Sequence, residues 1–185
     1  MGCYGDGGAV FTDDLALAEA ITSLRSHGRG SDKYDNRILG INSRMDTLQA
    51  AILLEKLNVF AQELDSRRRV AAQYQAALSR YGITPLIPPL AEPSWAQYTL
   101  RLPSRALRDA LKTDLEQQNI PITIYYPRPL HLQGAFAYLG IPKGSLPRSE
   151  EACERVLSLP MHAYLTDNEV AQICTAVVDF LERRG

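Results

Sequence analysis

The sequence predicts an α/β protein, or one of the related α+β class, that is built from two domains. Three observations support this prediction. Apolar residues recur every three to four positions from Met45 to Gly82, as in a long helix. Residues 84–93 are rich in proline, which lacks the amide donor that a helix needs. A strand pattern and a helix pattern follow. We therefore expect domains at 1–83 and 94–185, joined by a linker at 84–93.

The first domain should begin with a short strand and a helix. Residues 9–11 are apolar and suit a strand, and Thr12 or Asp13 could cap the helix that follows. Gly28 and Gly30 should end that helix. Residues 27–40 are polar and contain several glycines, so we expect a loop there. The pattern from Met45 predicts two helices or one bent helix, ending at Gly82.

The second domain should contain a strand, a helix and another strand, and then a last helix. Period-two alternation predicts the first strand, and Ser104 can cap a helix that stops before Asn119. Residues 120–126 are β-branched and aromatic and suit the second strand. Residues 166–169 match a capping box for the last helix. The alternating residues are Ala96, Tyr98, Leu100 and Leu102, and the stripe of the first helix is Leu107, Leu111 and Leu115.

The composition argues against several classes of function. The chain has 20 Lys and Arg against 21 Asp and Glu, and a net charge of -1 gives no basic surface for nucleic acid. No apolar run approaches the roughly 20 residues of a membrane span. The 3 cysteines are an odd number without metal-ligand spacing, which favours neither a disulfide framework nor a metal site. We therefore expect a cytoplasmic protein without membrane or nucleic-acid partners.

Four places could carry chemistry, and each has a simpler explanation. Residues 5–8 could cradle a phosphate, although a tight glycine turn explains them as well. Asn42 can donate to a phosphate and Arg44 can clamp a carboxylate, or they are an N-cap and a surface arginine. Tyr126 and His131 follow a proline-stiffened strand exit and could contact a substrate, but a lone histidine is more often structural. The C-terminal dipole of a helix suffices to explain His27.

Together, four phrases resemble the DegT/DnrJ/StrS family of sugar aminotransferases. They are Gly-Cys-Tyr-Gly-Asp-Gly-Gly-Ala at 2–9, His-Gly at 27–28, Gly-Ile-Asn-Ser-Arg-Met-Asp-Thr-Leu-Gln-Ala-Ala at 40–51, and Tyr-Pro-Arg-Pro-Leu-His-Leu-Gln at 126–133. The resemblance covers nearly the whole chain, including Leu-Ser-Leu-Pro at 157–160. The phrase Ser-Trp-Ala-Gln-Tyr-Thr at 94–99 further resembles the branch that aminates UDP-linked 2-acetamido-2-deoxy-3-oxo-hexuronates for surface polysaccharide.

This resemblance implies a fold, a cofactor and a set of site residues. The fold would be the C-terminal part of a pyridoxal-phosphate-dependent transferase, namely the end of the large domain plus the small domain, with active sites at a homodimer interface. Asn42 would bind the cofactor phosphate of the neighbouring subunit, and Arg44 would bind the acidic group of the sugar. His131 and Tyr126 would line the substrate pocket, with His27 as a weaker candidate. The substrates would be a nucleotide-linked keto-sugar and an amino donor, probably glutamate.

The lysine that carries the cofactor in this family has no counterpart here. It belongs to a phrase that would end at Met1, and Lys33, Lys56, Lys112 and Lys143 match no such phrase. That lysine also moves the proton in transamination, so we expect this chain to be inactive by itself and assign it no catalytic residue. Two alternatives remain open. The chain could be a non-catalytic module for sugar binding or dimerisation, or part of a related sugar dehydratase in which histidine replaces the lysine.

Overall fold

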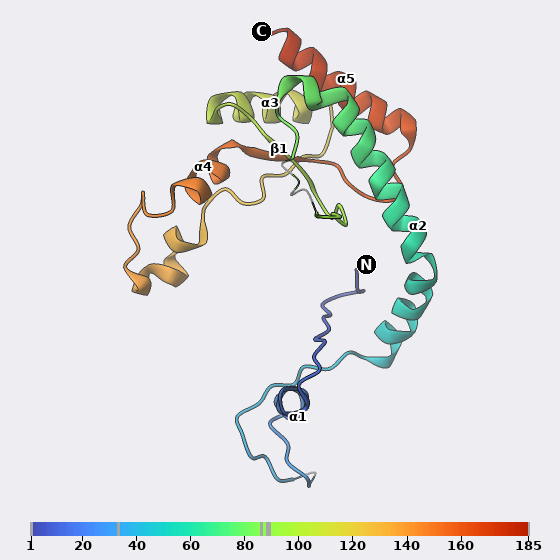
Figure 1. Cartoon of the computed structure of the whole chain (residues 1–185), viewed down its shortest axis with the longest axis vertical. Helices are drawn as coiled ribbons and strands as arrows, with labels where there is room; N and C mark the ends of the chain where they lie inside the picture. Colours follow the sequence, from blue (N-terminus) through green and yellow to red (C-terminus); the bar gives the residue numbers. More distant parts are fainter. Residues whose placement is uncertain (1, 33, 86, 88–89, 185) are drawn as a thin grey trace. The chain divides into compact units, whose positions relative to one another are not determined.

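The computed structural model describes residues 2–32, 34–85, 87 and 90–184, which form two compact units (Figure 1). Unit 1 is Met1–Ala61 and unit 2 is Gln62–Gly185. The division falls within a long helix rather than at the proline-rich segment. The linker at 84–93 stays a prediction, because Leu86, Pro88 and Pro89 lie outside the described residues.

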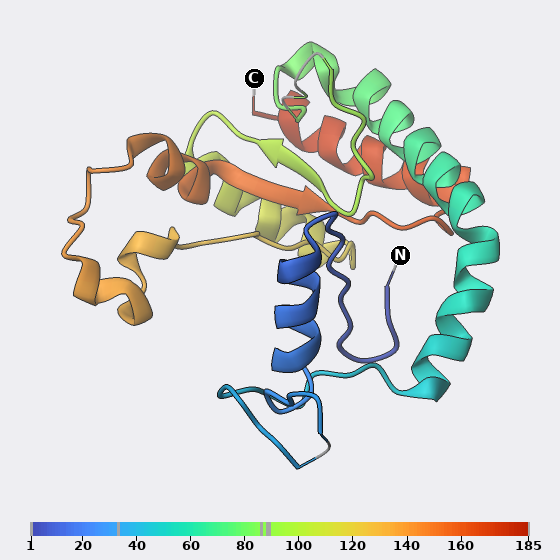
Figure 2. The same cartoon turned by 60° about the horizontal axis from the view of Figure 1, so that its bottom comes forward.

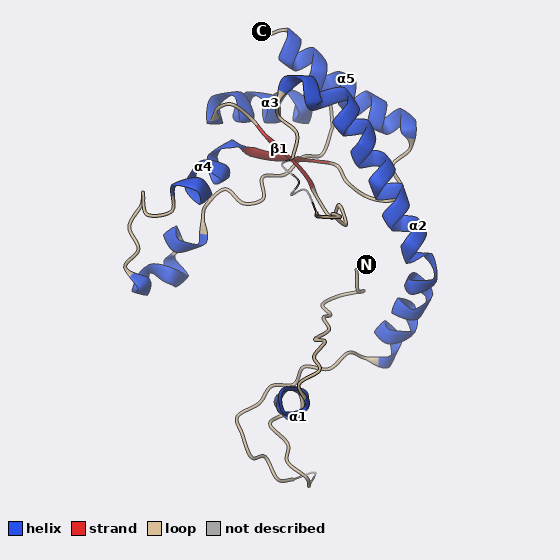
Figure 3. Ribbon diagram, in the orientation of Figure 1, coloured by secondary structure: helices blue, strands red, loops and turns tan. Residues whose placement is uncertain are grey.

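Unit 1 contains the helix α1, Leu15–Leu24, and a long loop region (Figure 3). The predicted cap at Thr12 or Asp13 is wrong, because the Asp14 carboxylate accepts the Leu17 amide at 3.1 Å. A capping side chain must reach the third amide of the helix, and Asp14 stands directly before the first turn. Thr12 acts one step earlier, since its hydroxyl accepts the Asp14 amide at 3.1 Å.

The strand predicted at residues 9–11 is absent from unit 1 as the structure describes it. Val10 and Phe11 are 68% and 92% exposed. A strand needs a neighbouring strand to use its backbone donors and acceptors, and no described segment pairs with these residues. The apolar pattern is therefore present without the partner that would make it a strand.

The apolar periodicity after Met45 forms one helix, α2, Thr47–Leu78. A short 3₁₀ turn, η1, Ser79–Tyr81, follows, and Gly82 ends the run with φ 66° as predicted. The C-terminal half of α2 belongs to unit 2. There it buries Val70, Ala71, Tyr74 and Leu78 in the core.

Unit 2 contains a two-stranded antiparallel sheet, β1, Tyr98–Arg101, and β2, Val156–Leu159 (Figure 2). Tyr98 pairs with Leu159, and Arg101 pairs with Val156. The predicted alternation is confirmed in β1, because Tyr98 and Leu100 are buried. The helix α4, Pro147–Arg155, leads directly into β2.

The second strand predicted at 120–126 is wrong, because only one bridge forms there. Thr123 and Ser158 exchange backbone hydrogen bonds of 3.2 and 2.8 Å. Pro121 lacks an amide and cannot extend the ladder toward the N-terminus. The sheet is instead completed by β2, which the strand pattern did not predict.

The two helices predicted for the second domain are confirmed together with their N-caps. In α3, Arg105–Gln117, the Ser104 hydroxyl accepts the Leu107 amide at 3.2 Å. In α5, Asp167–Glu182, Thr166 and Glu169 form the reciprocal capping box. Among the described helices, none is long and apolar enough to cross a membrane. The helices and the sheet share a core that includes Leu111, Leu115, Leu157, Val170, Val177 and Phe180.

Candidate functional site

Two glycines bring the end of α1 against the segment that contains the candidate residues Asn42 and Arg44. A Cβ on Gly40 would lie 2.0 Å from the Gly28 nitrogen, and one on Gly28 would lie 1.8 Å from the Ile38 carbonyl oxygen. Gly28 also has φ 71°. Side chains at these positions would force the two segments apart, so the crossing requires glycine at both.

Backbone hydrogen bonds hold this crossing together. The Ile41 amide donates to the Leu24 carbonyl at 2.8 Å, and the Ser43 amide donates to the Arg25 carbonyl at 2.9 Å. Ser26 and Asn42 form an antiparallel bridge. Residues 41–43 are therefore extended alongside the exit of α1, which fixes where their side chains point.

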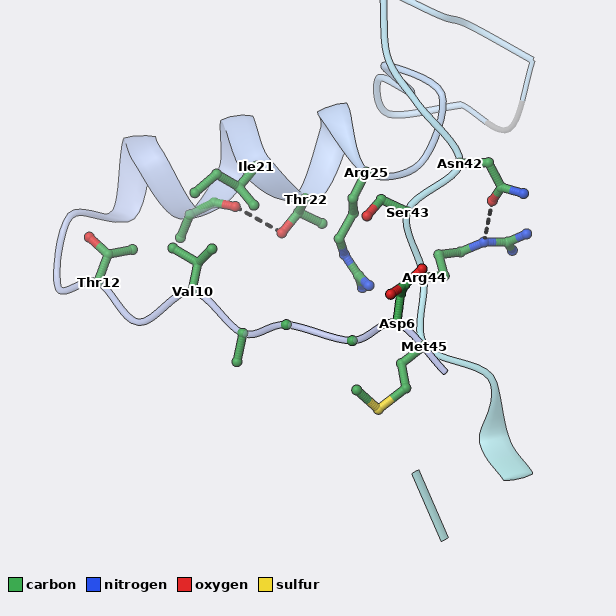
Figure 4. Close-up of a pocket in the computed structure, with 14 residues that line it drawn as sticks. Asp6, Val10, Thr12, Ile21, Thr22, Arg25, Asn42, Ser43, Arg44 and Met45 are labelled. Atoms are coloured by element: carbon green, nitrogen blue, oxygen red, sulfur yellow. Dashed lines mark hydrogen bonds between the residues drawn. The ribbon is translucent and has the colours of Figure 1, made fainter. Parts of the chain in front are cut away.

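The extended backbone separates the side chains of residues 42–44 onto two sides, as side chains alternate along a strand. Asn42 and Arg44 lie together on one side, where Arg44 Nε donates to Asn42 Oδ1 at 2.9 Å (Figure 4). Ser43 and Arg25 face the other side, toward α1. The structure thus brings the predicted pair Asn42 and Arg44 into direct contact.

This pair keeps donors available for an anion. The bond from Arg44 occupies the amide oxygen of Asn42, which leaves the Nδ2 group without an acceptor among the described residues. The two terminal nitrogens of Arg44 are likewise without a described partner. An amide and a planar guanidinium presented side by side suit a phosphate or a carboxylate.

The pair borders a hollow of about 920 Å³ within unit 1. Arg25 also lines it, and Asp6 is the one acidic residue among its described lining residues, so the positive charges outnumber the negative. Sequence analysis did not select Arg25. Its only signal was a basic side chain just after the predicted helix, which is common at helix C-termini.

Among the predicted site residues of unit 1, His27 does not line this hollow. It is exposed, and its backbone has φ 64°, in the left-handed region. Its amide donates to the Ile41 carbonyl at 3.0 Å. The position therefore contributes backbone to the glycine crossing, and the described contacts show no role for the imidazole.

Tyr126 and His131 belong to unit 2 and lie in different environments. Tyr126 is 68% exposed, and its ring meets that of Tyr125 edge to face with centroids 5.8 Å apart. His131 lies in a 3₁₀ turn, η2, Leu130–Leu132, and is only 8% exposed. It borders a second hollow of about 260 Å³ that Tyr126 does not line.

His131 has an acidic partner that sequence analysis missed. Its Nε2 lies 3.1 Å from Oε1 of Glu150, which comes from the first turn of α4. Burial would raise the pKa of the Glu150 carboxyl, but hydrogen bonds from the Gly144 and Leu146 amides and from His131 hold that pKa below its ordinary value. The two partners are 19 positions apart in the sequence, so no local pattern could reveal this pair.

Known proteins are similar to nearly the whole chain in sequence and in fold. A UDP-2-acetamido-2-deoxy-3-oxo-D-glucuronate aminotransferase of Pseudomonas aeruginosa is 42% identical over 180 residues, which are 97% of this chain and 48% of that protein. The crystal structure of a DegT DnrJ EryC1 StrS aminotransferase from Brucella abortus is 44% identical, with a TM-score of 0.87 over 97% of this chain and 47% of the other. The crystal structure of DesV of S. venezuelae is 37% identical, with a TM-score of 0.89 over 97% of this chain and 48% of the other.

The chain therefore spans about half the length of the relatives that it matches. Its similarity confirms the predicted fold class, a part of the α/β transferase fold. A family model describing the DegT/DnrJ/EryC1/StrS aminotransferases matches residues 1–178. The chain belongs to this aminotransferase family, whose aminotransferases depend on pyridoxal phosphate.

Proposed function

We propose that this chain supplies the C-terminal half of a pyridoxal-phosphate-dependent aminotransferase that acts on a nucleotide-linked keto-sugar, with glutamate as the amino donor, in the cytoplasm. The observation that carries this proposal is the contact between Asn42 and Arg44. In a member of this family, that contact supports a site for anionic groups. The sugar that we propose is a UDP-linked 3-oxo-hexuronate. This proposal is supported by the name of the Pseudomonas relative, which is 42% identical to this chain.

The donors of this chain fit the cofactor's phosphate. Because Arg44 Nε holds the amide oxygen of Asn42, the Nδ2 group is oriented as a donor and can bind a phosphate oxygen. Pyridoxal phosphate, when bound, supplies the electron sink that transamination needs. Asn42 contributes anchoring and orientation, and it moves no proton.

Arg44 is the residue that we assign to the sugar carboxylate. Its Nε is already committed to Asn42 at 2.9 Å, which fixes the guanidinium plane. The terminal nitrogens can then meet two carboxylate oxygens in the paired geometry that arginine favours. By the same resemblance, we assign Tyr126 and His131 of unit 2 to contacts with hydroxyl groups of the sugar.

We further propose that the chain alone does not transaminate. None of its lysines lies in a phrase that resembles the one around the family's cofactor lysine. Lys56 donates to the Gly2 carbonyl and Lys112 pairs with Glu116, while Lys33 lies outside the described residues. The proton transfer at the substrate carbon therefore depends on the other half of the enzyme.

Exposed apolar residues in unit 1 support an extensive interface. No hydrophobic side chain among its described residues is fully buried, and Phe11, Leu15 and Leu39 are 92%, 80% and 98% exposed. Apolar surface on this scale is normally covered by other polypeptide. We propose that the other half of the enzyme and a second copy cover it in a homodimer.

A chimera tests this function. The relative's matched 180 residues are replaced by this chain, so that the relative supplies its own N-terminal half. We expect the chimera to bind pyridoxal phosphate and to aminate UDP-2-acetamido-2-deoxy-3-oxo-D-glucuronate with glutamate. The 185-residue chain alone should do neither. If the chimera folds and binds the cofactor but shows no turnover, the proposed aminotransferase function is refuted. The non-catalytic or dehydratase alternatives would then be favoured.

A further inference from the structure

We propose that Glu150 is a positioning residue that holds His131 in one tautomer, with Nε2 protonated, so that Nδ1 accepts a hydrogen bond from a hydroxyl of the nucleotide-linked sugar. The substrate part of this inference rests on the proposed function. The tautomer and its cause rest on unit 2 alone.

Three hydrogen-bond donors hold the Glu150 carboxylate in place. The Gly144 amide lies 2.8 and 2.9 Å from its two oxygens, the Leu146 amide 3.3 Å from Oε1, and His131 Nε2 3.1 Å from Oε1. The side chain is only 13% exposed. Gly144 has φ 94°, a conformation that favours glycine and turns its amide toward the carboxylate.

This set of donors decides the protonation of the imidazole. An ionised carboxylate can only accept hydrogen bonds, so the 3.1 Å contact requires a proton on His131 Nε2. In a neutral imidazole, the other ring nitrogen is then an acceptor. The hydrogen bonds that keep Glu150 ionised therefore also fix what His131 can offer to a ligand.

The acceptor nitrogen remains accessible. No described residue hydrogen-bonds Nδ1, and the described part of the chain has no fully buried side-chain nitrogen or oxygen without a partner. Nδ1 must therefore reach solvent, although the ring as a whole is 8% exposed. His131 borders the 260 Å³ hollow together with Gln133 and mostly apolar residues, which suits a single directed hydrogen bond.

Nitrogen NMR of the 185-residue chain tests the tautomer directly. Unit 2 has its own hydrophobic core, so the measurement can be made on this chain without the other half of the enzyme. At about pH 8, where imidazoles are ordinarily neutral, we expect His131 to show almost only the Nε2-protonated form. Glu150→Gln should produce a mixture of tautomers, because its amide group opposes the Gly144 amide. Glu154→Gln, an exposed change in the same helix, should leave the spectrum unchanged.

Kinetics of the chimera test the substrate contact. Glu150→Gln should raise the KM for the keto-sugar on the order of tenfold, corresponding to one hydrogen bond, with unchanged cofactor absorbance. In a His131→Phe background the same change should have no further effect on KM, because the two residues act as one unit. Glu150→Asp should recover part of the loss if its shorter carboxylate still reaches Nε2.

The outcomes separate this inference from the proposed function. A Nδ1-protonated His131 in the unmodified chain would overturn the inference while leaving the aminotransferase intact. A Glu150→Gln chimera that loses stability but keeps its KM would also overturn it, since the pair would then only support the fold. A chimera without any turnover would count against the proposed function, and the NMR result would still decide the tautomer.

Discussion

Replacing Gly40 with alanine should disrupt the candidate anion site from a distance. The new Cβ would lie 2.0 Å from the Gly28 nitrogen, 2.4 Å from the His27 carbonyl carbon and 2.7 Å from the Leu24 carbonyl oxygen. All three are backbone atoms, so no flexible side chain can move aside. The segment containing Asn42 and Arg44 must instead move away from the end of α1.

The cost follows from the hydrogen bonds that this movement breaks. They are Ile41 to Leu24 at 2.8 Å, Ser43 to Arg25 at 2.9 Å and His27 to Ile41 at 3.0 Å. Each backbone bond contributes about 0.5–1.5 kcal/mol net, so their loss amounts to about 3 kcal/mol. That corresponds to roughly a 100-fold change in a local opening equilibrium.

Hydrogen exchange of the amides of His27, Ile41 and Ser43 measures this opening directly. Gly8→Ala is the matched control, because a Cβ there meets nothing within 4 Å. We expect Gly40→Ala to speed exchange at the three amides roughly 100-fold, whereas Gly8→Ala should leave that exchange unchanged. In the chimera, Gly40→Ala should also weaken cofactor binding. Equal protection in Gly40→Ala and the unmodified chain would refute the argument that this close approach positions the site.

Three further predictions concern a candidate site residue, a helix cap and stability in acid. In the chimera, Arg44→Lys should lower kcat/KM on the hexuronate by about one to two powers of ten, because lysine lacks the paired donors. The 6-hydroxy analogue should lose far less, and equal losses on both sugars would remove Arg44 from carboxylate recognition. Thr166→Ala should lower the free energy of unfolding by about 1 kcal/mol in urea titrations, whereas Thr166→Ser should not; equal losses would show that the cap hydroxyl is not the cause. Stability should also fall in acid. Hydrogen bonds from Thr166 hold the pKa of Glu169 below its ordinary 4.5, and the pKa of the Glu150 carboxyl is also below its ordinary value. Because both pKa values are depressed by folding, this stability is present above about pH 4.5 and lost as the pH falls through the folded values. Glu150→Gln should flatten that loss in urea titrations across this range, and an unchanged slope would contradict it.

Local sequence signals determined the helices of unit 2 and their ends. Ser104 and the Thr166–Glu169 box cap their helices as predicted, because capping depends on residues three positions apart. Gly82 ends the run after α2 for a similarly local reason, its left-handed backbone. The order of family phrases, including Asn42 and Arg44, also identified the family without any structure.

Tertiary structure decided which of the apolar and β-branched segments became strands and which side chains meet. The apolar residues 9–11 and the β-branched residues 120–126 have strand character, but a strand exists only where a partner supplies hydrogen bonds. The same holds for the site. The close approach of Gly40 to Gly28, and the contact between Glu150 and His131, 19 positions apart, both depend on distant segments coming together. Periodicity and spacing report only on neighbours along the chain, so these long-range contacts could be seen only in the folded protein.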